Sequence, residues 1–188
     1  MVLLLILSSL LISCSEHKLT ISCSKSNDLY AVLENSNIPF KLAASAKDAV
    51  LKADKGSGVI ILADDYPGKL TEIDEEVYSV AREKKLRLFI EYPSFIPGTV
   101  TGSVQRTQWE RAVVSSGAFA PALSKLRILA VNDCHFIPIE SDSSDIVIAR
   151  VAGFDSAVYG LPDKVFPVLT EINTADGLPL LVSTTKLS

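Results

Sequence analysis

The stretch GVIILA at residues 58–63 decides the fold class of this chain. A continuous apolar run rich in β-branched residues is typical of a parallel strand that is covered on both faces. The loop DDYPG (64–68) ends this strand, a helical segment follows at 70–86, and RLFIE (87–91) is the next strand. The apolar stripe of the helix comprises Leu70, Ile73, Val77 and Ala81. This order predicts a parallel pair of strands joined by a right-handed crossover.

The same alternation extends towards the N-terminus. Residues 19–24 and 40–44 read as strands, and residues 28–38 and 46–53 read as helices. The first helix carries its apolar stripe on Leu29, Val32 and Leu33, and Ser45 with Asp48 forms a capping box at the start of the second. We expect all four strands of this half to be parallel. The predicted fold is therefore α/β, with a doubly wound, mainly parallel, flavodoxin-like sheet.

The second half of the chain contains mostly short strand patterns and little helix. These patterns lie at residues 110–115, 126–131, 136–139, 145–151, 165–172 and 180–183. Some should extend the parallel sheet, and others should form additional antiparallel strands in the C-terminal half. The sequence stops straight after a strand, without the helix that an α/β fold normally adds. We therefore expect the domain to be the N-terminal part of a longer protein.

Composition narrows the class of protein. The 188 residues suffice for one domain, and a hydrophobic fraction of 48 % supports a folded core. The formal net charge is −4, so no basic patch for nucleic acid is expected. Cys23 and Cys134 are interpreted as small buried thiols, with a disulfide between them as the alternative.

The first residues resemble an export signal. Residues 2–12 are apolar apart from two serines, which is the length of a signal-peptide core and too short for a membrane-spanning helix. The sequence LISC at 11–14 matches a bacterial lipobox, although no Lys or Arg precedes the apolar run. We expect a signal peptide at 1–13, a lipid on Cys14, a tether at 14–18 and one domain at 19–188. An uncleaved buried segment is the alternative. The expected location is the cell envelope, lipid-anchored on the periplasmic face or outer surface of a bacterial outer membrane.

Polar and aromatic residues follow the predicted strands at their carboxyl ends. In open α/β sheets, ligands bind in the crevice outside these ends. The candidate residues of this crevice are Asn27, Asp64, Asp65, Tyr66, Glu91, Tyr92, Ser94 and Asn132. Three of them are carboxylates that could meet around a divalent cation, but adjacent acids after a strand more often cap loops, so we predict no metal and no cofactor. Three aromatic residues could form a platform for a sugar ring, with simple packing as the alternative: Tyr66, Tyr92 and Trp109.

The segments GVIILADDYPG (58–68) and RLFIEYPS (87–94) resemble the class I glutamine amidotransferase-like superfamily. This resemblance covers residues 19–97 in the order of elements. A narrower resemblance is to the amidotransferase-like domain at the front of large Bacteroidetes carbohydrate-active lipoproteins. It rests on REKKLRLFIEYPSFIPG (82–98), FDSAVYGLP (154–162) and LLVSTTKLS (180–188). In such proteins a helical, glycosidase-like domain follows the point at which this chain stops.

The chain lacks the catalytic residues that are typical of the superfamily. Active members place a nucleophilic cysteine on a tight elbow between small residues, activated by a histidine and a glutamate. Here the strand ends with Glu91, Tyr92 and Pro93, and the chain's only histidines are His17 and His135. We expect no catalytic residue in this chain, no enzymatic activity and no nucleic-acid partner.

Three functions remain open at this point. The first is a non-catalytic accessory or ligand-binding domain of an envelope lipoprotein involved in carbohydrate processing. The second is the N-terminal fragment of a glycan-degrading hydrolase or lyase whose catalytic domain lies downstream. The third is a structural spacer. The expected partners are a membrane reached through the lipid, a carbohydrate, and a downstream domain of the same protein.

Overall fold

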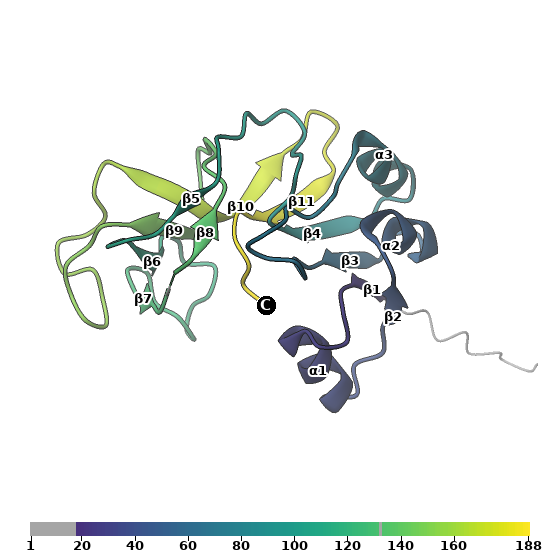
Figure 1. Cartoon of the computed structure of the whole chain (residues 1–188), viewed down its shortest axis with the longest axis horizontal. Coiled ribbons are helices and arrows are strands. Elements are labelled where there is room, and N and C mark those ends of the chain that lie inside the picture. Colours follow the sequence, from purple (N-terminus) through teal and green to yellow (C-terminus); the bar gives the residue numbers. More distant parts are fainter. Residues whose placement is uncertain (1–17, 132) are drawn as a thin grey trace, which may run out of the picture.

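The computed structural model describes residues 18–131 and 133–188, in which one large mixed sheet forms the centre of the fold (Figure 1). Its strand order is β2-β1-β3-β4-β11-β10-β9-β6-β7, and β5 and β8 form a separate small pair. The helices are α1 (Asp28–Asn35), α2 (Ala46–Lys52) and α3 (Glu75–Glu83). The strands of the first half are β1 (Leu19–Ser22), β2 (Lys41–Ala43), β3 (Gly58–Ile61) and β4 (Arg87–Glu91). The later strands are β5 (Gln105–Arg106), β6 (Arg111–Val114), β7 (Ile128–Leu129), β8 (His135–Phe136), β9 (Ile146–Ala149), β10 (Val165–Asn173) and β11 (Pro179–Ser183).

The first half of the sheet is parallel, as the apolar runs predicted. β2, β1, β3, β4 and β11 all run in the same direction, so their carboxyl ends lie at one edge. Buried side chains of α2 and α3 share a core with Val59 and Leu88 on one face of this sheet. Helix α1 packs on the opposite face, where Leu33 meets Ile21. The prediction of a strand, helix and crossover around residues 58–91 is therefore confirmed.

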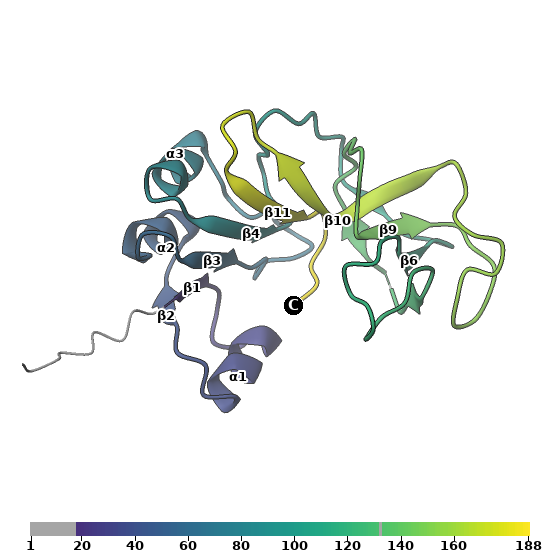
Figure 2. The same ribbon diagram turned by 180° about the vertical axis from the view of Figure 1, so that it is seen from behind.

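The second half of the sheet is antiparallel. The long strand β10 joins the halves, because its first residues pair with β9 and its last residues pair with β11. An irregularity between Pro167 and Leu169 lies where β10 changes partner. Figure 2 shows the two halves on either side of β10, with all three helices on the parallel side. The expected antiparallel additions in the C-terminal half are confirmed.

Helix α3 begins later than the sequence pattern indicated. The prediction started this helix at Leu70, whereas the structure starts it at Glu75, after Asp74. The Asp74 side chain accepts the backbone N–H of Val77 at 3.1 Å and so caps the helix. Thr71 is held instead in a bridge to Pro93, so the residues before the cap are extended. The prediction of helix at residues 70–74 was wrong, because the long-range pairing of Thr71 with Pro93 overrides the local apolar periodicity.

Two smaller predictions also need correction. On α1, Val32 is exposed, and Tyr30 and Leu33 are the buried side chains. On β3, the cover of both faces is incomplete, because Ile60 is only half-buried while Val59 and Ile61 are buried. Phe89 of β4 is likewise only half-buried on this face, which α1 covers only in part. No helix within the described residues is long and apolar enough to cross a membrane.

Candidate functional site

The carboxyl ends of β1, β3, β4 and β11 form the site, as parallel topology requires. The C-terminal segment, residues 184–188, follows β11 and crosses this edge. In Figures 1 and 2 the C-terminal end lies between α1 and the antiparallel half of the sheet. Segments from both halves of the chain therefore meet here.

Glu91, the last residue of β4, is fully buried, and its carboxylate accepts hydrogen bonds from several directions. Oε2 accepts the N–H of Ala63 at 3.1 Å and the hydroxyl of Ser188 at 2.9 Å. Oε1 accepts the backbone N–H groups of Leu187 and Ser188, each at 2.9 Å. A buried carboxylate is costly unless it is hydrogen-bonded, and here neutral donors satisfy it. Glu91 thus fastens the C-terminal segment to the end of β4.

Asn27 and Asp64 reinforce the same edge. The Asn27 carbonyl oxygen caps α1 by accepting the N–H of Leu29, and its amide donates to the Ser188 hydroxyl at 3.0 Å. Asp64 accepts the backbone N–H of Ser24 at 2.7 Å, which ties the loops after β1 and β3 together. These two candidate residues therefore hold loops in place around Glu91.

Tyr66 lies at the centre of a polar cluster between the two halves of the sheet. Its hydroxyl donates to the carbonyl of His135 at 3.0 Å, and it also meets the backbone N–H of that residue. Thr185 donates to the same carbonyl at 2.7 Å, and its hydroxyl lies 2.8 Å from Sγ of Cys134. Burial raises the pKa of Tyr66 to about 12, so the phenol keeps its proton and remains a donor at neutral pH.

A hollow of about 320 Å³ opens beside this cluster, and we call it the Tyr66 hollow. Its lining includes polar groups, from the Tyr66, Cys134 and Thr185 side chains and the C-terminal segment. It also includes apolar side chains from β6, β9 and β10. Its lining residues are Tyr66, Ala112, Ala130, Val131, Cys134, Ile148, Val168, Thr185, Lys186, Leu187 and Ser188. This volume lies at the lower end of the range that is typical of small-molecule sites.

The remaining candidate residues do not line this hollow. Asp65 is exposed and lines a separate hollow of about 170 Å³ together with Asp64. The Ser94 hydroxyl accepts the N–H of Ile73 at 3.0 Å, so it supports the segment before α3. Tyr92 is buried and packs edge-on against Tyr66, with ring centroids 5.0 Å apart. Asn132 lies outside the described residues.

The aromatic platform is formed only in part. Tyr66 and Tyr92 meet, but within the described residues Trp109 makes no ring contact with either, and it is 76 % exposed. The carboxylates do not gather either: residues 18–131 and 133–188 contain no group of three His, Cys, Asp or Glu side chains that could hold a metal ion. The site is therefore built from hydrogen-bonding groups around an apolar hollow.

The turn after β4 has an unusual backbone conformation. Tyr92 has a φ of 49°, in the left-handed region that bulky residues rarely adopt. Its neighbours are Glu91 and Pro93, so no thiol or hydroxyl nucleophile stands beside a base at this turn. Burial and the charges of Asp64 and Glu91 raise the pKa of Cys23 to about 11, which disfavours its thiolate. Both Cys23 and Cys134 are free.

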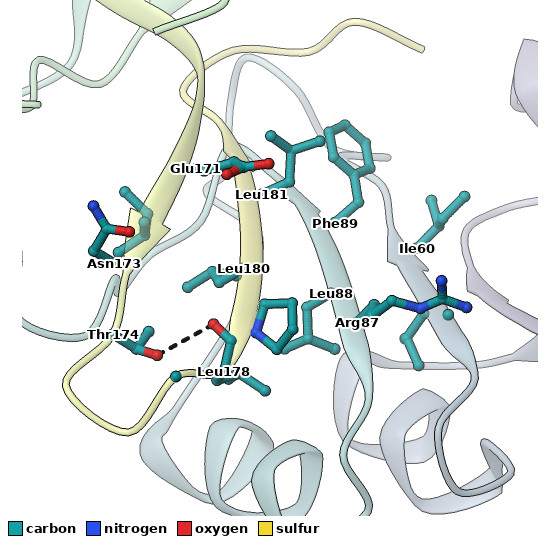
Figure 3. Close-up of a pocket in the computed structure, with 15 residues that line it drawn as sticks. Ile60, Arg87, Leu88, Phe89, Glu171, Asn173, Thr174, Leu178, Leu180 and Leu181 are labelled. Carbon is teal, nitrogen blue, oxygen red and sulfur yellow. Dashed lines mark hydrogen bonds between the residues drawn. The ribbon is translucent and has the colours of Figure 1, made fainter. Parts of the chain in front are cut away.

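A second hollow, of about 430 Å³, lies at the opposite end of the parallel strands (Figure 3). It is lined by the amino ends of β3, β4 and β11 and by the end of β10. Apolar side chains such as Phe89 and Leu181 lie between Arg87 and Glu171 in this region. None of the candidate residues from the sequence lines it.

The candidate residues predicted from the sequence include neither Thr185 nor Cys134. Thr185 follows β11, and the direction of β11 places that residue at the same edge as Glu91. Its polar run TTKLS after an apolar strand was the available signal. Cys134 is adjacent to the small strand β8. The pairing of β8 with β5 could not be predicted, because neither two-residue strand shows a periodic pattern.

Comparison with models of known protein families and with curated proteins gave no match for this chain.

Proposed function

We propose that this chain is a non-catalytic ligand-binding domain that takes a carbohydrate in the Tyr66 hollow. The observation that supports this best is the hollow itself, whose lining combines apolar side chains with hydroxyl and thiol groups. A sugar ring needs both kinds of contact, since its C–H face is apolar and its hydroxyl rim needs hydrogen-bond partners. The resemblance of residues 58–68 and 87–94 to amidotransferase-like domains of carbohydrate-active lipoproteins points to the same ligand class.

The proposal includes the architecture of that superfamily. The order β2-β1-β3-β4-β11 corresponds to the 2-1-3-4-5 order of flavodoxin-like sheets. The helices α1 and α2 lie on opposite faces. These features support a doubly wound relationship, with the antiparallel strands as an addition. The proposed place of the domain is a bacterial envelope, through a lipid on Cys14, which lies outside the described residues.

The charge of one lining residue indicates which class of carbohydrate the hollow should favour. Lys186 is the only lysine or arginine among the lining residues, and the lining contains no Asp or Glu side chain. A cation beside a hydrogen-bonding wall favours a sugar with a carboxylate over a neutral one. We therefore expect glucuronate-containing glycans to bind more tightly than their glucose counterparts.

Calorimetric titration with matched glucuronate and glucose oligosaccharides tests this proposal. Ala130 is exposed and lines the hollow, so Ala130→Trp should fill it without disturbing the core. Ala118→Trp is the matched control, because Ala118 is exposed and does not line the hollow. We expect binding that Ala130→Trp abolishes and Ala118→Trp retains. Absence of binding to the whole series, or binding unaffected by Ala130→Trp, would contradict the proposal.

A further inference from the structure

Four large apolar side chains stand exposed at the far end of the antiparallel half of the sheet. Trp109 is 76 % exposed, Phe154 is 89 % exposed, Val158 is 63 % exposed and Tyr159 is 90 % exposed. We call them the aromatic surface. None of them lines a hollow described above. Three of the four lie within residues 154–159, and monomeric proteins seldom expose a large apolar patch without a partner.

The two segments that carry the aromatic surface are joined to each other. Arg111 of β6 pairs with Ala149 of β9, and its guanidinium donates to the carbonyl of Gly153 at 2.8 Å. Nε of Arg150 lies 3.3 Å from a carboxylate oxygen of Glu110. These contacts hold the residues around Trp109 beside the loop after β9. In Figures 1 and 2 that loop is at the end of the molecule farthest from the helices.

The charge of this region is opposite in sign to that of the whole chain. Residues 107–128 and 149–165 together contain five Lys or Arg and three Asp or Glu, whereas the whole chain has a net charge of −4. The cations are Arg111, Lys125, Arg127, Arg150 and Lys164. Arg127 is paired with Asp155 and Arg150 with Glu110, so the local excess of positive charge comes from Arg111, Lys125 and Lys164 against Asp163.

We propose that the aromatic surface binds the headgroup layer of an anionic lipid bilayer. Trp and Tyr side chains concentrate at membrane interfaces, where the ring is apolar and its polar atom stays hydrated. Lysine and arginine side chains beside them attract anionic headgroups. The side chains stand out from the surface rather than lining a pocket, which suits a broad layer more than a small ligand. This inference goes beyond carbohydrate binding and is independent of the lipid expected on Cys14.

Trp109 is the only tryptophan of the chain, so its fluorescence reports on this surface alone. The test uses the full chain with Cys14→Ala, mixed with vesicles of phosphatidylcholine alone or with phosphatidylglycerol. With the anionic vesicles, we expect Trp109 emission to move to shorter wavelength and to be quenched by brominated acyl chains. Lys125→Gln with Lys164→Gln removes two exposed cations that are in no ion pair with another described residue, and should weaken partitioning about thirtyfold, at about tenfold for each 1.4 kcal/mol.

Substitutions at exposed residues of the aromatic surface test its role without disturbing the core. Phe154→Ala with Tyr159→Ala should reduce vesicle binding and leave the circular dichroism spectrum unchanged, because neither side chain is packed. Val100→Ala is the matched control, since Val100 is 89 % exposed and lies outside the aromatic surface. The proposal is overturned if Trp109 emission does not respond while the chain sediments with vesicles, which would mean contact through residues 1–17 alone. The proposal is also overturned if Trp109 emission responds to soluble glycans but not to vesicles. Vesicle binding by Phe154→Ala with Tyr159→Ala that equals binding by the unsubstituted surface would overturn it as well.

Discussion

The backbone N–H of Ser188 donates to the carboxylate of Glu91 at 2.9 Å, across 97 positions of sequence. Through this bond and its neighbours, the end of β4 holds the segment that forms one wall of the Tyr66 hollow. The last residue of β4 thus anchors this wall. The acidic residue at the strand end therefore has a structural role that shapes the proposed binding site.

Replacing Glu91 should loosen that wall. Glu91→Gln keeps the size of the side chain but turns one acceptor oxygen into a donor, which faces backbone N–H groups. A buried donor left without a partner costs about 1–3 kcal/mol, so we expect a loss of that size in the free energy of unfolding. Urea denaturation measures it.

Amide exchange locates the effect of the same variant. The N–H groups of Leu187 and Ser188 should exchange faster in Glu91→Gln, because a neutral amide oxygen is a weaker acceptor than a carboxylate oxygen. Glu171→Gln is the control, since Glu171 is exposed and accepts no hydrogen bond from the C-terminal segment. Unchanged protection of both amides would contradict the anchoring role of Glu91.

Cys23 should be a poor nucleophile at neutral pH. Burial, with the charges of Asp64 and Glu91, raises its pKa from 9.0 to about 11, which lowers the thiolate fraction roughly hundredfold below pH 9. In a chain carrying Cys14→Ala and Cys134→Ala, alkylation by iodoacetamide should accelerate towards pH 11. Asp64→Asn should speed the reaction at pH 8, because it removes one repelling charge.

The raised pKa of Cys23 should also make the free energy of unfolding depend on pH. The unfolded thiol ionises near pH 9 and the folded thiol near pH 11, so the folded state binds the proton more tightly. This contribution to the free energy of unfolding is complete below pH 9 and is lost as pH rises through that window. Alkylation with a midpoint near pH 9 would show that Cys23 is not shielded.

We also predict that the chain has no glutaminase or esterase activity. Neither Cys23 nor Cys134 stands on the turn after β4, and Tyr92 occupies the left-handed position there. His135 directly follows Cys134, and neighbours on a strand point to opposite faces. The assay incubates the protein with glutamine and activated esters. Turnover that is abolished by Cys23→Ala or Cys134→Ala would reveal a working enzyme.

The parallel half of the fold could be predicted from sequence because its signals are local. The apolar run at 58–63 and the capping pair Ser45 and Asp48 each act within a few residues, and the Ser45 side chain does accept the N–H of Asp48. The start of α3 could not be predicted, since it depends on the bridge between Thr71 and Pro93.

The site was harder to predict than the fold. Parallel topology brought Glu91 and Asn27 to one edge, as expected from strand ends. The Tyr66 hollow depends on a contact between Tyr66 and Thr185, which are 119 positions apart. No periodic pattern encodes such a pairing, because it arises only when β11 inserts beside β4.

The lipid on Cys14 is a separate prediction, based on the apolar run 2–12 and the lipobox at 11–14. If it is correct, the mature protein begins at Cys14 and carries acyl chains on it. Mass spectrometry of protein extracted from its native host measures both features. A chain that retains Met1 and an unmodified Cys14 thiol would contradict the prediction.

Carbohydrate binding in the Tyr66 hollow is the central claim, and an amide chemical-shift titration with a glucuronate oligosaccharide tests it most directly. We predict that shifts concentrate at Tyr66, Cys134 and residues 184–188, and that Lys186→Ala reduces affinity for glucuronate more than for its glucose counterpart. Amides of α3, which contribute nothing to the hollow, serve as the internal control. Shifts confined to another surface, or no shifts at saturating sugar, would contradict the claim.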